Sequence, residues 1–63
     1  MLNENLRRIR TEQRYTRKQL GELAGIAPTT IQLIENGTID NPSLKTILGL
    51  SKALKVSILT LIK

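Results

Sequence analysis

Residues 17–37 read RKQLGELAGIAPTTIQLIENG, a stretch in which glycine and proline mark off two short helical segments. Gly25 is suited to end the first segment, because glycine accepts the positive φ with which many helices terminate. Pro28 is suited to the first turn of the second segment, where its missing N–H is not needed. Asn36 and Gly37 are suited to end that segment. The stretch therefore predicts two short helices joined by a tight turn, at residues 17–24 and about 28–36.

Two short helices joined in this way form the helix-turn-helix pattern. The small Gly21 lets the second helix cross close over the first. Apolar side chains that hold the pair to a core are Leu20, Ala24, Ile26, Ile31 and Ile34. The opposite side of the helix at 28–36 is then left facing outward. An α-helix fits the major groove of B-DNA, where base edges present distinct donor, acceptor and methyl patterns.

The N-terminal part of the chain contains two further helix boundaries. Asn3 is expected to cap a helix that runs to about Arg14. Thr16 is expected to cap the helix at 17–24, and its spacing to Gln19 is that of a capping box, in which each residue bonds the other's backbone N–H.

The C-terminal part predicts two more helices. Pro42 and Ser43 open a helix that runs to about Leu54, and Ser57 caps a last helix through Ile62. The apolar stripe expected on the first of these consists of Leu44, Ile47, Leu48, Ser51 and Leu54. The expected fold class is all-α, a compact five-helix single domain over residues 1–63.

The charge is strongly basic and unevenly distributed. The chain has 10 Lys and Arg against 5 Asp and Glu, a net charge of +5. A dense group of basic residues consists of Arg7, Arg8, Arg10, Arg14, Arg17 and Lys18. This density indicates a polyanionic partner. The alternative is that solvated lysines and arginines keep a small domain soluble, and charge alone does not separate the two.

The composition argues against catalysis and metal binding. Cysteine and histidine are absent, so thiolate or imidazole ligands and a histidine base are absent too. The five acidic residues form no pair suited to acid–base chemistry, and serine and threonine have no base to activate them. We expect neither an enzyme nor a metal or cofactor site.

The sequence gives no sign of a membrane or secreted protein. Met1 leads into Asn3, Glu4 and Asn5 instead of a basic start and an apolar run, so no signal peptide is expected. No stretch approaches the ~18 apolar residues of a membrane span. A cytoplasmic, nucleoid-associated location is the expectation.

Across nearly its whole length the chain resembles the lambda-repressor/Cro-like (XRE) helix-turn-helix family. The resemblance is carried by Leu20, Gly25, Ile26, Thr30-Ile31, Ile34-Glu35-Asn36-Gly37, Asn41-Pro42-Ser43-Leu44, Leu48, Leu50, Ala53-Leu54 and Val56-Ser57. It implies the five-helix lambda-repressor-like fold, with the third helix in the DNA major groove and neighbouring segments on the phosphates. It also implies that Glu35 pairs with Arg10 on the first helix.

These considerations assign roles to named residues. The residues expected to contact bases are Pro28, Thr29, Thr30, Gln32 and Leu33, although Leu33 could instead pack in the core. The residues expected to contact phosphates are Arg10, Arg17, Lys18, Asn36, Thr38 and Lys45.

The last helix is apolar on more than one side. We expect Ile58, Leu59, Leu61 and Ile62 to form either a dimerisation surface or the junction to a further domain. The predicted function is a homodimeric, sequence-specific double-stranded DNA-binding transcriptional regulator that acts as a repressor. The alternative is a protein-interaction module with the same fold, such as an antitoxin, whose partner is a toxin or an effector domain.

Overall fold

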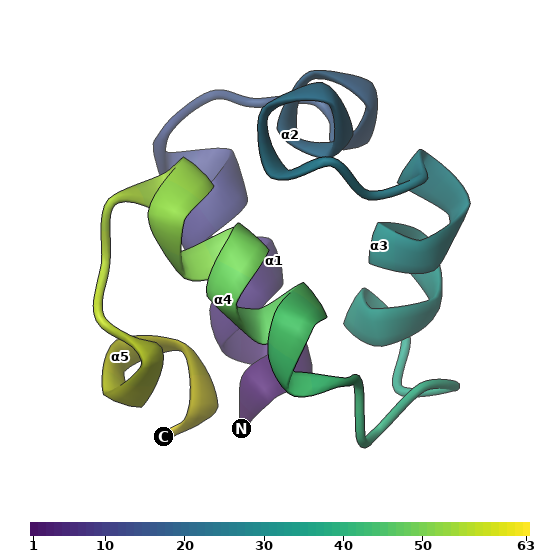
Figure 1. Cartoon of the computed structure of the whole chain (residues 1–63), viewed down its shortest axis with the longest axis vertical. Coiled ribbons are helices and arrows are strands. Elements are labelled where there is room, and N and C mark those ends of the chain that lie inside the picture. The colour runs from purple at the N-terminus through teal and green to yellow at the C-terminus, as the bar shows by residue number, and fades with distance from the viewer.

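The computed structural model describes all 63 residues, and helices are its only regular secondary structure (Figure 1). They are α1 (Leu2–Glu12), α2 (Arg17–Ala24), α3 (Pro28–Glu35), α4 (Leu44–Leu54) and α5 (Ile58–Ile62). α2 packs against α3 and α4, and α1 packs against α3 and α5. The chain ends meet, since the Met1 amino group donates a hydrogen bond to the Lys63 carbonyl oxygen at 3.1 Å. The predicted all-α, five-helix fold is confirmed.

None of the five helices combines the length and the apolar character needed to cross a lipid bilayer.

The boundary before α2 is fixed by the predicted capping box. The Thr16 hydroxyl accepts a hydrogen bond from the Gln19 amide at 3.0 Å, and the Gln19 side-chain oxygen accepts one from the Thr16 amide at 2.9 Å. Two backbone donors at a helix start, which have no partner inside the helix, are thereby satisfied. At the other end of α2, Gly25 has φ 72°, the left-handed conformation that glycine adopts readily.

The boundaries before α4 and α5 are fixed by serine caps, of which the one at Ser57 was predicted. The Ser43 hydroxyl accepts from the Thr46 amide at 3.2 Å, and the Ser57 hydroxyl accepts from the Thr60 amide at 3.1 Å. Each cap satisfies one otherwise unpaired N–H of its helix start.

The first helix departs from the prediction at both ends. It begins at Leu2, so Asn3 lies inside it and caps nothing, and it ends at Glu12, two residues earlier than expected. Arg14 has φ 62°, a left-handed conformation that no helix continues through.

Eight aliphatic residues from all five helices form one core: Leu6, Ile9, Leu20, Ile31, Ile34, Leu50, Leu54 and Leu61. The stripe predicted for α4 is wrong in part. Leu44 and Leu48 are exposed, and Leu50 takes the buried position beside Ser51 and Leu54. Leu50, Ser51 and Leu54 share one side of a helix with Ile47, so α4 is rotated relative to the predicted face.

Small residues allow the helices to approach closely at two points. A Cβ added at Gly21 would overlap the carbonyl oxygen of Ile26 in the turn before α3. A Cβ added at Gly49 would lie 2.9 Å from the carbonyl oxygen of Ala24, where α4 meets the end of α2. The expectation that Gly21 permits a close helix pair is confirmed.

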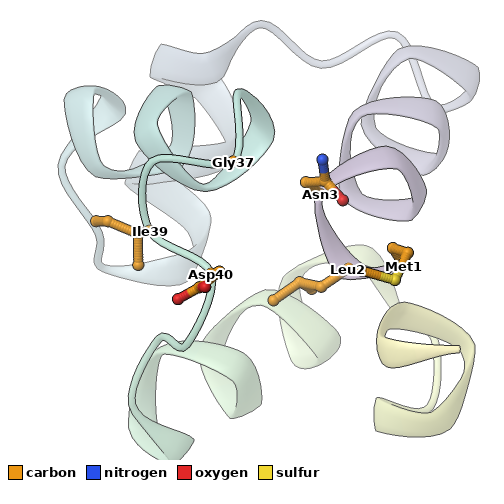
Figure 2. Close-up of a pocket in the computed structure, with 6 residues that line it drawn as sticks. All are labelled: Met1, Leu2, Asn3, Gly37, Ile39 and Asp40. Atoms are coloured by element: carbon orange, nitrogen blue, oxygen red, sulfur yellow. The ribbon is translucent and has the colours of Figure 1, made fainter.

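The loop between α3 and α4 lies across from the start of α1. Gly37, Ile39 and Asp40 of this loop line a cavity of about 200 Å³ together with Met1, Leu2 and Asn3, which lie on the other side of it in Figure 2. Ile39 and Leu2 both pack against the core, so this loop is anchored at one of its middle residues.

The capping box before α2 gives a first prediction. Thr16→Ala removes the cap and should lower the free energy of unfolding by about 1 kcal/mol, which urea denaturation measures. Thr38→Ala is the control, because Thr38 is exposed and its hydroxyl makes no hydrogen bond within the protein. Equal stability losses in the two variants would mean that the cap contributes nothing of its own.

Candidate functional site

α3 has one side in the core and one side in solvent. Ile31, Ile34 and Glu35 are buried on the inner side. Figure 1 shows α3 at the edge of the molecule, with α2 at one end and the loop to α4 at the other. α3 thus lies at the edge of the molecule and contacts the rest of the protein through its inner side.

The predicted base-contacting residues are not equally exposed. Pro28, Thr29 and Gln32 are exposed, whereas Thr30 and Leu33 are half-buried. The outward side of α3 therefore offers a pyrrolidine ring, a hydroxyl with a methyl group, and a primary amide. This surface is uncharged and carries both donors and acceptors.

Glu35 is the last residue of α3, lies on its buried side and joins three helices. Its carboxylate accepts hydrogen bonds from Arg10 of α1, at 2.6 Å from Nε and 3.1 Å from Nη2. It also accepts one from the Nε of Arg17 of α2 at 3.1 Å. The Arg10–Glu35 ion pair implied by the family resemblance is present. The bond from Arg17 was not predicted from the sequence, because no local pattern links residues 18 positions apart.

Arg10 is buried and bonded within the protein through its whole guanidinium group. The residue is only 9% exposed, and its Nη1 donates to the backbone oxygen of Tyr15 at 2.8 Å. Each of its three side-chain nitrogens therefore has an intramolecular acceptor. Because these bonds hold the side chain in the interior, the burial of Arg10 disfavours the predicted phosphate contact.

Arg17 remains accessible, in contrast to Arg10. Its side chain is 40% exposed, against 2% for Glu35, and its recorded hydrogen bond uses Nε alone. The terminal nitrogens, Nη1 and Nη2, make no hydrogen bond within the protein. An arginine fork with free terminal N–H groups is suited to an oxyanion.

The remaining predicted phosphate contacts lie in segments that flank α3 in the chain. Lys18 in α2, Thr38 after α3 and Lys45 in α4 are exposed. Asn36 is exposed too, but its side-chain oxygen accepts from the Thr38 amide at 2.9 Å, so it shapes the turn. Only its Nδ2 stays free to donate elsewhere.

The predicted interface on α5 needs one correction. Leu61 is fully buried and belongs to the core, so it is not available to a partner. Leu59 is 63% exposed and Ile62 is 44% exposed, while Ile58 is half-buried. The side of α5 that faces away from Leu61 is therefore an apolar surface open to solvent.

Sequence reasoning also missed two side-chain bonds that fasten α1. Asn5 donates to the carbonyl oxygen of Leu61 at 2.9 Å, and Gln13 donates to that of Leu54 at 2.7 Å. Both acceptors are in the last turns of helices, where carbonyl groups lack partners inside the helix.

This chain belongs to the helix-turn-helix family of the lambda-repressor/Cro (XRE) type, because a helix-turn-helix family model matches residues 6–61. Members of this family are DNA-binding regulators, and the family is not a class of enzymes. The HTH-type transcriptional regulators SinR of Bacillus subtilis (strain 168) and Bacillus licheniformis are each 32% identical over 62 residues, which cover 98% of this chain. The chain spans 56% of the length of these relatives.

Solved structures of the family superpose closely on this one. The crystal structure of SinR, the master regulator for biofilm formation, in complex with DNA has a TM-score of 0.94 at 32% identity, over 100% of both chains. The restriction-modification controller protein C.AhdI from Aeromonas hydrophila has a TM-score of 0.90 at 30% identity, over 95% of this chain and 89% of its own.

Glu35 and the two arginines bonded to it, Arg10 and Arg17, form what we call the Glu35 network. The two arginines should differ in their effect on stability. Arg10→Ala should lower the free energy of unfolding by about 3 kcal/mol, because it removes a buried charged partner. Arg17→Ala should cost less than about 1 kcal/mol, because that side chain is partly screened by water. Chemical denaturation of both variants checks this order, and equal losses would contradict it.

Proposed function

We propose that this chain is a sequence-specific, double-stranded DNA-binding transcriptional regulator that places α3 in the major groove. The observation that carries the proposal is the uncharged, donor- and acceptor-rich outer side of α3, in a fold that superposes on DNA-complexed SinR with a TM-score of 0.94.

In this proposal the phosphates supply affinity and position. Arg17, Lys18 and Lys45 bind phosphate oxygens by charge, and Thr38 and Asn36 add neutral donors. Such contacts act on every sequence alike and weaken as salt rises, because bound counterions are released on complex formation.

The outer side of α3 supplies discrimination between sequences. Gln32 can bond adenine through its two-ended amide, and Thr29 offers both a hydroxyl and a methyl group. Pro28 contributes apolar contact alone. Thr30 and Leu33, being half-buried, reach the groove only at their outer atoms, where Leu33 can meet thymine methyl groups.

The exposed apolar side of α5 supports a symmetric dimer on an inverted repeat. Leu59 and Ile62, with Ile58 beside them, would be covered by the same residues of a second copy. The two recognition helices would then lie about 34–36 Å apart, one helical turn of DNA. Occupation of such an operator would repress transcription, in the cytoplasm at the nucleoid.

A second candidate is a module that binds a protein through the same fold. It is favoured by the match to SinR in the SinR/SinI complex, which has a TM-score of 0.93 and of which this chain covers 61%. A salt titration with specific and scrambled duplexes separates the two candidates. No DNA affinity at low salt would favour the protein partner, and a steep salt dependence without preference would support nonspecific DNA binding only.

The base-contacting role of α3 can be tested on its two exposed polar residues. Thr29→Ala with Gln32→Ala should reduce the ratio of specific to nonspecific affinity by about 10-fold or more, because each correct base contact contributes about 1–3 kcal/mol of discrimination. Fluorescence anisotropy with a duplex selected from a random pool and with its scrambled version measures this ratio. Thr11→Ala, an exposed threonine of α1, should leave it unchanged. An equal loss of affinity on both duplexes would reject the role.

The dimer surface can be tested by the oligomeric state. Leu59→Ser with Ile62→Ser should shift the chain toward monomer in sedimentation velocity and weaken binding to an inverted repeat more than binding to a half-site. Leu44→Ser is the matched control, because Leu44 is an equally exposed leucine on α4. If the control dissociates the dimer and the α5 variant does not, the interface lies elsewhere.

A further inference from the structure

We propose that Glu35 is a positioning residue for DNA binding, because its buried carboxylate holds Arg17 by Nε and leaves the terminal amino groups of that arginine to a phosphate. The inference rests on the proposed DNA-binding function and adds a residue that does not itself touch DNA. It assigns the Glu35 network a second role besides the stability of the fold.

The geometry separates the two ends of the Arg17 guanidinium. Nε lies 3.1 Å from Oε1 of Glu35, whose side chain is 2% exposed, whereas the arginine side chain as a whole is 40% exposed. The guanidinium has five N–H groups in a rigid planar fork. One of them points inward to the carboxylate, and the four on Nη1 and Nη2 remain for an external acceptor.

The charges around Glu35 are not balanced. Arg10 alone, bonded through both Nε and Nη2, already neutralises the buried carboxylate. With Arg17 the group carries one carboxylate and two guanidinium ions, a net charge of +1. Burial of Glu35 does not require the second arginine, and the surplus charge is at the exposed end of the group.

The place of Arg17 in α2 points in the same direction. It is the first residue of the helix, where a positive side chain opposes the helix dipole. This unfavourable location is explained by an anion that binds there, and the helix start itself favours the same anion.

The benefit of the anchor is a smaller loss of side-chain freedom on binding. A free arginine loses rotamer entropy when it is fixed on a phosphate, and an arginine held in advance loses less. Release of Arg17 from Glu35 should therefore weaken DNA binding about 3- to 10-fold, as expected for one immobilised side chain.

A double-mutant cycle tests the coupling. The affinity for a short mixed-sequence fluorescent duplex is measured by anisotropy at several NaCl concentrations, which suffices because phosphate contacts are independent of sequence. The proteins are the unmodified chain, Arg17→Ala, Glu35→Gln and the double variant, each confirmed as folded by circular dichroism. Loss of the carboxylate charge alone raises affinity for DNA in both backgrounds. The quantity compared is the change in DNA affinity that Glu35→Gln causes in each of two backgrounds. We expect this change to be about 3- to 10-fold less favourable when Arg17 is present than in the Arg17→Ala background.

Arg17→Lys keeps the cycle falsifiable if Glu35→Gln does not fold. It preserves the charge at a partly exposed position, but a single ammonium group cannot bond Glu35 and present a fork outward. We expect DNA affinity to fall by the same 3- to 10-fold as when Arg17 is released from its hydrogen bond to Glu35. Affinity equal to that of the unmodified chain would overturn the proposal.

The outcomes distinguish the inference from the function on which it rests. If Arg17→Ala weakens binding and flattens the salt dependence but Glu35→Gln has the same effect in both backgrounds, the positioning role is wrong and the phosphate contact stands. If Arg17→Ala behaves like Arg7→Ala, an equal charge loss on the exposed side of α1, the phosphate contact itself fails. No DNA affinity in the unmodified chain rejects the proposed function altogether.

Discussion

The buried carboxylate of Glu35 ties three of the five helices together. The aliphatic core drives the helices together and selects which side of each helix is buried, as Ile31 and Ile34 do for α3. Hydrogen bonds from Arg10 and Arg17 to one carboxylate are directional, and they join α1, α2 and α3 at a single point. Because a buried carboxylate without partners is strongly unfavourable, the two bonds from Arg10 reinforce the rotation of α3 that core packing selects.

That rotation determines which side chains of α3 meet solvent. With Ile31, Ile34 and Glu35 turned inward, Pro28, Thr29 and Gln32 face outward. The one acidic residue of α3 is thus removed from a surface where it would repel phosphates. The proposed function follows from this division, together with the exposed Lys18 of α2 and Lys45 of α4 in the segments before and after α3 in the chain.

Features that depend on neighbours in the chain could be predicted from the sequence, and features that depend on distant contacts could not. The caps at Thr16 and Ser57, the helix start at Ser43 and the left-handed Gly25 are local, and all are confirmed. The buried face of α4 was misassigned because that helix is apolar on two sides, and only packing on the other helices selects Leu50 over Leu44 and Leu48. Leu61 was placed on the surface for the same reason.

The bond from Arg17 to Glu35 joins residues of separate helices and has no signal in spacing or composition. Among the site residues, the outward side of α3 was predictable from its helical period, whereas the division of work between Arg10 and Arg17 was not.

We propose that the outer side of α3 is the surface that meets DNA. Backbone amide chemical shifts of the ¹⁵N-labelled chain, followed as a short duplex is added, test it most directly. We expect the largest changes at Thr29, Gln32 and Thr38 and at the start of α2, with little change along α5. Changes concentrated on the exposed side of α1 around Arg7 and Arg8, with α3 unaffected, would contradict it.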